Sequence, residues 1–350
     1  MAQSSNKYVV PPECVQDLGR MVNTLSGSTI LFLGGTGLIG RWFFELLGSL
    51  DGHADDSVTF VVSGRSRPTW LADQYGPVNA EFLALDFLSS ASMSVFEENV
   101  APFDGIFHFA APSAADTFAG MRGPDKYRLA LSSASQLYKL VDSFSPRFLL
   151  LASSGVAVQS VDDTVDEYEN LAPDLFSEVE SLSNGKRTLE RAVFELSSSQ
   201  TSSAVARIFT CYGPHIPTEL HYAMGNFIGQ ARRGQPIVVN SAGTDRRSYL
   251  YASDLICAIA RLVVRLCGPS KDSFSIYNMG GQEPITIAEL ANKIAALVGP
   301  ESCEVRVKGG CSSIGNRVRR DYVPDVTRAK EAEILIERVS LDAGLRSLLV

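Results

Sequence analysis

The sequence Ile30-Leu31-Phe32-Leu33-Gly34-Gly35-Thr36-Gly37-Leu38-Ile39-Gly40 is a short apolar run followed by a cluster of glycines. Gly35, Gly37 and Gly40 match G-x-G-x-x-G, whereas Gly34, Gly37 and Gly40 match G-x-x-G-x-x-G, so the spacing leaves the register open. In either register a strand turns tightly into a helix, which brings backbone N–H groups and the positive helix end to a pyrophosphate. A Cβ atom at these positions would block that approach.

The flanking sequence favours a βαβ unit around this turn. Thr29 to Leu33 has the composition of a strand, and the apolar residues from Leu38 to Leu50 recur at the spacing of one helix face. A second β-prone run, Val58 to Val62, follows at the distance that a crossover connection requires. The first part of the chain is therefore predicted to bind a dinucleotide.

Composition limits the other possibilities. The formal net charge of −8 provides no basic surface for nucleic acid or for an anionic membrane. Six cysteines without C-x-x-C spacing and four histidines without an H-x-x-x-H pair predict no metal site and favour a reducing compartment. The first residues lack the apolar core of a signal peptide, and no apolar run approaches the ~20 residues that span a bilayer. We expect a cytoplasmic protein.

The remaining pattern predicts an α/β fold, a Rossmann-type doubly wound parallel sheet with a smaller C-terminal α/β domain. We expect an N-terminal extension over residues 1–28, a nucleotide-binding domain over 29–209, and a mainly substrate-binding part over 210–350, some segments of which return to the first domain. Open α/β sheets bind ligands beyond the carboxyl ends of their strands. The residues expected to border one crevice there are Gly34, Arg65, Asp86, Ala110 and Ser154.

Several short motifs together resemble the extended short-chain dehydrogenase/reductase superfamily, and within it the nucleotide-sugar epimerase/dehydratase family. They occur in the family's order from the glycine turn almost to the C-terminus. The matching segments are G-G-T-G-L-I-G at 34–40, H-F-A-A at 108–111, A-S-S at 152–154, N-G-K-R-T-L-E at 184–190, Y-G-P at 212–214, R-R-S-Y-L-Y-A-S-D-L at 246–255, Y-N-M-G-G at 277–281 and Y-V-P-D-V-T-R-A at 322–329.

The resemblance implies where a cofactor and a substrate would bind. It assigns the pyrophosphate to Gly34, Gly35, Thr36, Gly37, Leu38, Ile39 and Gly40, the adenine border to Asp86 and Phe87, and the nicotinamide side to Ala110 and Ala111. Arg247 stands where the family holds the diphosphate of a sugar nucleotide, Arg320 is a second candidate clamp, and Thr210 replaces a common asparagine.

The end of the second predicted strand bears on the choice of cofactor. An acidic residue there would accept hydrogen bonds from the ribose 2′-OH, whereas a cation would pair with a 2′-phosphate. The segment Ser63-Gly64-Arg65-Ser66-Arg67 contains no carboxylate. It favours NADP, with NAD as the alternative because an arginine also stacks on adenine.

The catalytic pattern of the family is incomplete in this chain. Its members use a Ser or Thr to orient the substrate oxygen, a Tyr to pass a proton, and a Lys to hold the ribose and lower the Tyr pKa. Ser154 and Lys186 match the first and the last, but Leu182 stands where the tyrosine belongs, and no tyrosine in the chain is followed by Lys four residues later.

Three replacements for the missing phenol are open from the sequence. Lys186 could act directly if its pKa fell towards neutrality, Tyr168 could fold into the site, or the substrate could exchange its proton with water. The principal hypothesis is thus an NAD(P)-dependent nucleotide-sugar oxidoreductase with non-standard proton transfer. The alternative is a binding or regulatory protein that kept both pockets and lost turnover.

The resemblance also implies how copies of the chain would associate. Family members often pair through helices that correspond to residues 125–142 and 182–197, and small residues at 130–135 would permit close packing. We therefore expect a homodimer, with a nucleotide sugar as the other partner and neither nucleic acid nor membrane.

Overall fold

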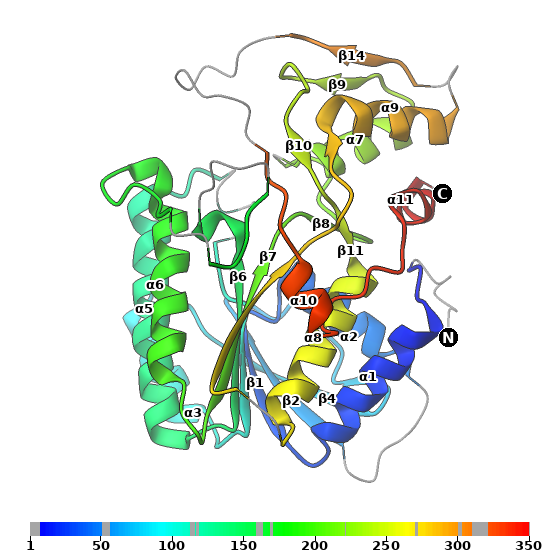
Figure 1. Cartoon of the computed structure of the whole chain (residues 1–350). Coiled ribbons are helices and arrows are strands. Elements are labelled where there is room, and N and C mark those ends of the chain that lie inside the picture. The colour runs from blue at the N-terminus through cyan, green and yellow to red at the C-terminus, as the bar shows by residue number, and fades with distance from the viewer. Residues whose placement is uncertain are drawn as a thin grey trace.

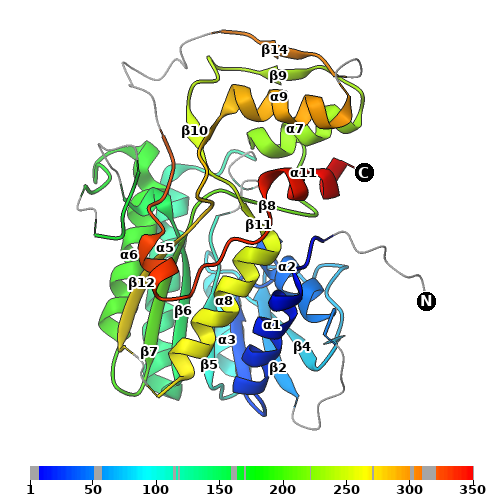
Figure 2. The same cartoon turned by 45° about the vertical axis from the view of Figure 1, so that its right-hand side comes forward.

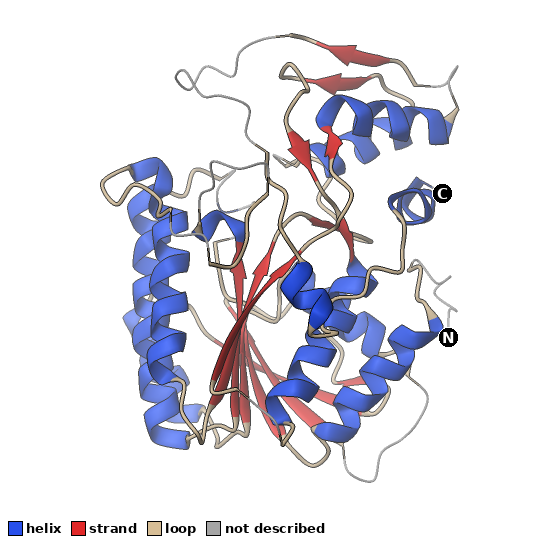
Figure 3. Ribbon diagram, viewed as in Figure 1, coloured by secondary structure: helices blue, strands red, loops and turns tan. Residues whose placement is uncertain are grey.

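The computed structural model describes residues 8–50, 57–112, 116, 119–158, 164–168, 171–220, 222–269, 272–299, 303–309 and 321–349. A twisted central sheet lies between two layers of helices, and a smaller group of helices and strands lies beyond one end of the sheet (Figure 3). The α/β class and the mostly parallel sheet agree with the fold predicted from the sequence.

The central sheet has eight strands in the order β12-β7-β6-β5-β1-β2-β4-β3. All neighbouring pairs are parallel except β3 with β4. The strands are β1 (Thr29–Leu33), β2 (Val58–Gly64), β3 (Gln74–Tyr75), β4 (Val78–Ala84), β5 (Gly105–His108), β6 (Phe148–Ser154), β7 (Ser202–Ile208) and β12 (Phe274–Met279). Parallel pairing brings the carboxyl ends of these strands to one edge, below the smaller lobe (Figure 1).

Helices cover both faces of this sheet. One face carries α3 (Ser90–Asn99), α5 (Gly123–Phe144) and α6 (Ser181–Leu196), and the other carries α1 (Pro12–Thr24), α2 (Leu38–Leu47) and α8 (Ala252–Cys267) (Figures 1 and 2). Buried on both sides, β6 and β7 read as nearly continuous apolar or small residues, as expected of interior parallel strands. Among the described helices, none combines the length and the apolarity that a membrane span requires.

Phenylalanines from successive elements form the centre of the core on the α2 face. The ring of Phe32 on β1 packs against Phe43 and Phe44 on α2 at centroid distances of 5.6 and 5.9 Å, and against Phe107 on β5 at 5.2 Å. All of these side chains are completely buried. Aromatic pairs in such tilted and edge-on geometries add to the stabilisation that their buried area provides, so the first strand and helix are held rigidly together.

The smaller lobe is built from C-terminal segments. It contains α7 (Ala223–Arg232), α9 (Ile287–Val298) and α11 (Leu341–Leu349), with β9 (Ile237–Val239) parallel to β14 (Val305–Val307). Two short strand pairs and one short helix lie between this lobe and the main body. The pairs are β8 (Cys211–Tyr212) with β11 (Leu250–Tyr251) and β10 (Arg246–Arg247) with β13 (Ile285–Thr286), and the helix is α10 (Thr327–Glu331). The helix α8 and the strand β12 lie between these segments in sequence but belong to the central sheet assembly.

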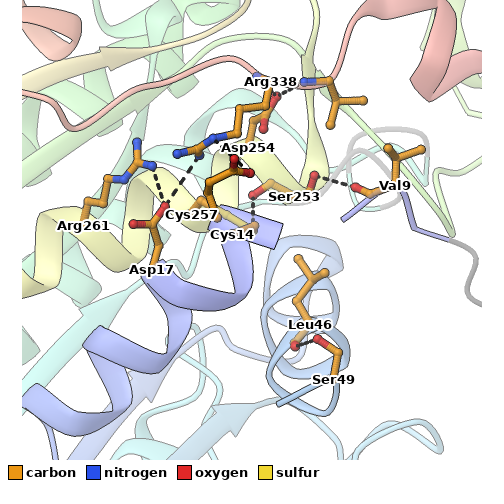
Figure 4. Close-up of a disulfide and its surroundings, with 12 residues drawn as sticks. Val9, Cys14, Asp17, Leu46, Ser49, Ser253, Asp254, Cys257, Arg261 and Arg338 are labelled. Atoms are coloured by element: carbon orange, nitrogen blue, oxygen red, sulfur yellow. Dashed lines mark hydrogen bonds and ion pairs between the residues drawn. A yellow bond between two sulfur atoms is a disulfide. The ribbon is translucent and has the colours of Figure 1, made fainter. Parts of the chain in front are cut away.

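The N-terminal helix α1 packs along α8 and is joined to it covalently. A disulfide links Cys14 to Cys257, and the Asp17 carboxylate lies between Arg261 and Arg338 (Figure 4). The expectation of reduced cysteines is wrong for this pair. The residues are 243 positions apart, and only the packing of α1 on α8 brings their Cα atoms to 5.5 Å.

A second set of contacts holds Tyr8, the first described residue, against α2. The Glu45 carboxylate on α2 accepts hydrogen bonds from the Tyr8 hydroxyl at 2.6 Å and from Arg41 Nε at 2.7 Å, and it lies 2.8 Å from His215 Nε2. Burial alone would raise the pKa of Glu45, but the hydrogen bonds from His215, Tyr8 and Arg41 lower it to about 2.

This cluster predicts an acid-sensitive contribution to stability. A carboxylate whose pKa is lower in the folded than in the unfolded chain stabilises the fold above its unfolded pKa of 4.5, and the stabilisation is lost as the pH falls towards 2. The side chain is 24% exposed, so we expect on the order of 2 kcal/mol rather than the full shift. Thermal unfolding of Glu45→Gln and the wild type should differ most at pH 7, and the difference should shrink below pH 4.5 and vanish only near pH 2. A difference independent of pH would contradict this prediction.

Candidate active site

The glycine turn connects β1 to α2 at the carboxyl edge of the sheet. Gly34 has φ +78°, and a Cβ there would lie 2.4 Å from the backbone nitrogen of Ala110. A Cβ on Gly40 would lie 2.0 Å from the carbonyl oxygen of Gly35, because the first turn of α2 packs directly on the loop. Gly37 is different, since its Cβ would meet nothing closer than 3.5 Å.

These three positions separate the roles that a dinucleotide-binding turn needs. Gly34 provides the tight turn, Gly40 the close packing of helix and strand, and Gly37, at the N-cap of α2, a backbone that a ligand can approach. Of the two registers left open by the sequence, this geometry favours G-x-x-G-x-x-G, because the nearest neighbours of an added Cβ on Gly35 are side-chain atoms of Phe32 and Val62, both at 2.9 Å. Thr36, Leu38 and Ile39 lie within the same turn and first helical residues. This cradle fits a pyrophosphate.

The end of β2 lies beside the turn. Gly34 N–H donates to the Ser63 carbonyl at 3.0 Å, and the Ser63 hydroxyl is buried with no hydrogen-bond partner among the described residues. The Arg65 side chain is 65% exposed and pairs with Asp116 at 2.9 Å. Asp116 therefore places a carboxylate next to Arg65, which the sequence around β2 did not indicate.

Asp86 and Phe87 follow β4 along the same edge. The Asp86 carboxylate accepts a hydrogen bond from the Leu88 N–H at 2.9 Å and so shapes the loop after the strand. The Phe87 side chain is buried, and its ring lies 6.0 Å from that of His108. Asp86 is partly exposed at the edge, whereas Phe87 supports it from inside.

A small pocket lies between the end of β5 and the helices α5 and α6. Ala110 and Ala111 line it on the strand side, and Leu182 and Lys186 line it from α6. The structure therefore places Leu182 beside the lysine that the family pairs with a tyrosine. With a leucine at this position, α6 offers no hydroxyl to the pocket.

Lys186 is buried and its ammonium donates a hydrogen bond to the Ala152 carbonyl on β6 at 2.9 Å. Burial lowers the pKa of Lys186 to about 8, against an opposing effect of the Glu190 charge. His108 lies nearby and is completely buried, and burial together with the Lys186 charge lowers its pKa to about 3. His108 is therefore neutral, and its Nε2 contacts the Ser133 hydroxyl. Burial thus moves the pKa of Lys186 in the direction that its direct participation would require.

A buried ion pair supports this part of α6. Glu190, one helical turn after Lys186, accepts hydrogen bonds from Arg207 Nε at 3.0 Å and Arg207 Nη2 at 2.8 Å, and from the Ser153 hydroxyl at 2.6 Å. Arg207 Nη1 donates to the Glu167 carbonyl at 3.1 Å. These contacts join α6 to β6 and β7 below the site.

Ser154 stands at the end of β6, two residues beyond the carbonyl that holds Lys186. Its hydroxyl lies 3.2 Å from the phenol oxygen of Tyr322. The Tyr322 ring packs on Phe209 at a centroid distance of 4.7 Å, and the Arg247 guanidinium lies 5.7 Å from the centre of the same ring. Burial raises the pKa of Tyr322 to about 12, although Ser154 and Arg247 both act to lower it.

The predicted substrate residues lie on the side of the smaller lobe. Arg247 on β10 is partly buried, and its Nη1 donates to the Arg246 carbonyl at 2.7 Å. Thr210 lies between β7 and β8, where its carbonyl accepts the Leu250 N–H at 3.0 Å. Arg320 lies outside the described residues.

Tyr168, which the sequence left open as a replacement for the missing phenol, lies at the surface. It is 70% exposed, and its hydroxyl accepts a hydrogen bond from Arg328 at 2.6 Å. Tyr168 therefore does not reach Ser154 in this structure.

Tyr322 is the site residue that sequence reasoning did not single out. A search for a tyrosine four residues before a lysine could detect only a partner on the same helix, and it finds none. Tyr322 comes instead from a segment 168 positions after Ser154. The available signal was its place at the start of the motif Y-V-P-D-V-T-R-A.

Comparison with known proteins is consistent with this geometry. A model of the NAD-dependent epimerase/dehydratase family matches residues 30–280. Among curated proteins, UDP-glucuronic acid decarboxylase 5 from Arabidopsis thaliana is 26% identical over 342 residues, which cover 96% of this chain and 92% of the relative.

Solved structures share the fold. The epimerase Mth375 from Methanothermobacter thermautotrophicus superposes with a TM-score of 0.71 at 19% identity, covering 96% of this chain and 94% of that one. UDP-glucuronic acid 4-epimerase from Bacillus cereus, solved in complex with NAD, superposes with a TM-score of 0.67 at 17% identity, covering 91% of this chain and 94% of that one.

Proposed function

Because the chain belongs to the NAD-dependent epimerase/dehydratase family, we propose that it is an oxidoreductase that uses a nicotinamide dinucleotide to modify a nucleotide sugar. The observation that carries this proposal is the shared edge of the sheet. The glycine turn follows β1 and Ser154 ends β6, with β5 between these strands, and Lys186 on α6 donates to the Ala152 carbonyl of β6. This is the place where open α/β sheets bind their ligands.

The cradle formed by Gly34, Gly37 and Gly40 fits the pyrophosphate of the cofactor. Bound there, the nicotinamide would supply a reversible hydride acceptor at the reacting carbon. Arg65 and the absence of a carboxylate at the end of β2 support NADP, whereas the pairing of Arg65 with Asp116 supports NAD. We propose NADP as the preferred form, with NAD as the alternative.

For the substrate, we propose a uridine diphosphate sugar. The support is the similarity over 96% of the chain to a UDP-glucuronic acid decarboxylase. Arg247 would pair with the diphosphate, with Arg320 as a second clamp and Thr210 beside the sugar. Ser154 would orient the oxygen of the reacting carbon, and Lys186 would hold the cofactor ribose. Proton transfer would be non-standard because of Leu182.

A second candidate function is favoured by Leu182 itself. Leucine has no proton to transfer, and general acid–base groups typically contribute ~10²–10⁴-fold to rate. A protein that kept both pockets and lost turnover would bind cofactor and sugar nucleotide without converting them.

One experiment separates the two candidates. The purified chain is incubated with NADP or NAD and a panel of UDP-, dTDP-, GDP- and CDP-sugars, and the products are analysed by mass spectrometry and NMR. Conversion of one sugar supports the enzyme, whereas tight binding by calorimetry with no conversion supports the binding protein. Calorimetry with the two dinucleotides also decides the cofactor preference.

Lys186 makes a specific prediction for the enzyme. Lys186→Met is expected to lower turnover about 10²-fold or more, because the ammonium is lost from the ribose side of the site. In the wild type, turnover should fall as the pH rises through about 8, where Lys186 loses its proton, and this limb should be absent in the variant. Lys139→Met, on the exposed face of α5, is the matched control. An unchanged pH profile in Lys186→Met would contradict the assignment.

We propose that the chain forms a homodimer through α5 and α6. Exposed apolar side chains on α5 and α6, Leu131, Tyr138 and Phe194, support pairing through these helices, but Ala130 and Ala134 are buried inside the chain, Ala130 against Gly185. Multi-angle light scattering tests the dimer.

The cytoplasmic location expected from the sequence is not favoured by the Cys14–Cys257 disulfide, since disulfides persist mainly in oxidising compartments.

A further inference from the structure

We propose that Tyr322 supplies the phenol that position 182 lacks and exchanges a proton with the substrate oxygen that Ser154 orients. This inference rests on the proposed function. Its basis is the 3.2 Å approach of the Tyr322 hydroxyl to the Ser154 hydroxyl. A phenol within hydrogen-bond reach of the orienting serine is within reach of an oxygen that the serine binds.

The segment that carries Tyr322 is anchored on both sides of the phenol. Asp321 accepts hydrogen bonds from Arg246 Nε at 2.8 Å and Arg246 Nη2 at 2.6 Å, and the Tyr322 N–H donates to the Arg246 carbonyl at 3.0 Å. The ring lies against Phe209. Tyr322 is therefore positioned by backbone and side chain together, as a proton-transferring group requires.

The proton transfer can be written for both directions of the reaction, and the reductive direction is the one that the buried phenol favours. When the substrate carbonyl is reduced, its carbon accepts a hydride, the C=O π pair moves to the oxygen, and that oxygen takes the proton from Tyr322. The phenolate left behind would be stabilised by the positive charge of Arg247 and by the backbone hydrogen bond from Val156. When the alcohol is oxidised, the phenolate takes the hydroxyl proton back as the hydride leaves the carbon.

The resting protonation state suits the reductive direction, in which the phenol donates first. Burial raises the pKa of Tyr322 to about 12, so the free protein holds the proton at neutral pH and can act first as an acid. Leu182 cannot take part, and Tyr168 lies at the surface against Arg328. Within the part of the chain that the structure describes, Tyr322 is the tyrosine whose hydroxyl contacts Ser154.

The test uses the full chain and a Tyr322→Phe variant. Tyr212→Phe is the matched control, because Tyr212 is a buried tyrosine of the same lobe whose hydroxyl bonds the Leu341 carbonyl at 3.2 Å. With the sugar nucleotide that the wild type converts, Tyr322→Phe is expected to lose ~10²–10⁴-fold in turnover and the control less than about threefold. In the Tyr322→Phe background, Leu182→Tyr is expected to restore part of the loss, because it returns a phenol to α6.

A binding measurement separates a catalytic from a structural effect. Calorimetry is done with cofactor present, using UDP-glucuronic acid and UDP. Tyr322→Phe should weaken the sugar nucleotide about 2–10-fold relative to UDP, since one hydrogen bond to the sugar is lost. Equal weakening of both ligands, or turnover within threefold of the wild type, would overturn the inference and leave the proposed function intact. A wild-type chain that binds and converts none of the sugars would overturn the proposed function, and the inference with it.

Discussion

Replacing Gly37 with alanine is expected to weaken dinucleotide binding roughly 100-fold, which is about 2.7 kcal/mol, and to change the thermal unfolding midpoint very little. The fold has room for an added Cβ at this position, whereas a bound pyrophosphate does not. A Cβ on Gly37 would meet no protein atom closer than 3.5 Å, but it would stand where the pyrophosphate approaches the backbone at the start of α2.

Gly34→Ala and Gly40→Ala form the contrasting pair. At Gly34 an added Cβ would lie 2.4 Å from the Ala110 nitrogen at a φ of +78°, and at Gly40 it would lie 2.0 Å from a carbonyl oxygen of Gly35. Both backbones would have to move, so these variants should lose several kcal/mol of stability as well as binding. Calorimetry with each dinucleotide and thermal unfolding of the three variants check the contrast. Normal binding by Gly37→Ala would mean that the turn does not hold the pyrophosphate.

Glu190→Ala is expected to cost about 3–5 kcal/mol of unfolding free energy. Arg207 and Glu190 have side-chain exposures of 7% and 10%, and Ser153 also donates to the carboxylate. Removing Glu190 leaves a buried guanidinium with its main acceptor gone, and the desolvation cost of that charge is then uncompensated.

Glu195→Ala is the matched control for this prediction. Glu195 lies on the same helix and pairs with Arg191, but their side chains are 44% and 70% exposed. Exposed i,i+4 pairs contribute only about 0.3–0.5 kcal/mol, so the two alanine variants should differ clearly in urea unfolding. If Glu190→Ala and Glu195→Ala shift the midpoint equally, the buried pair does not support α6 as proposed here.

Local sequence pattern predicted most of the secondary structure. The run Thr29 to Leu33 forms β1 with the predicted bounds, and the run Val58 to Val62 lies within β2 (Val58–Gly64). The helix face predicted from Leu38 onward belongs to α2 (Leu38–Leu47). These predictions succeed because hydrophobic periodicity and glycine position act within a few residues of one another.

Local sequence pattern did not predict which distant segments pair with each other. The strand β12 (Phe274–Met279) returns to pair with β7, and Cys14 meets Cys257 across 243 residues. Neither contact leaves a local signal, because each depends on how whole helices and strands pack. The register of the glycine turn was also undecided, since Gly34 and Gly35 fit their patterns equally well until Ala110 was placed beside Gly34.

By itself the sequence determined the α/β class, the glycine turn, and the presence of Ser154, Lys186 and a leucine four residues before that lysine. The tertiary structure decided that Tyr322 lies 3.2 Å from Ser154 and that burial lowers the pKa of Lys186 to about 8. Motifs are short-range properties of the chain, whereas proximity and desolvation arise only when segments far apart in sequence exclude water together.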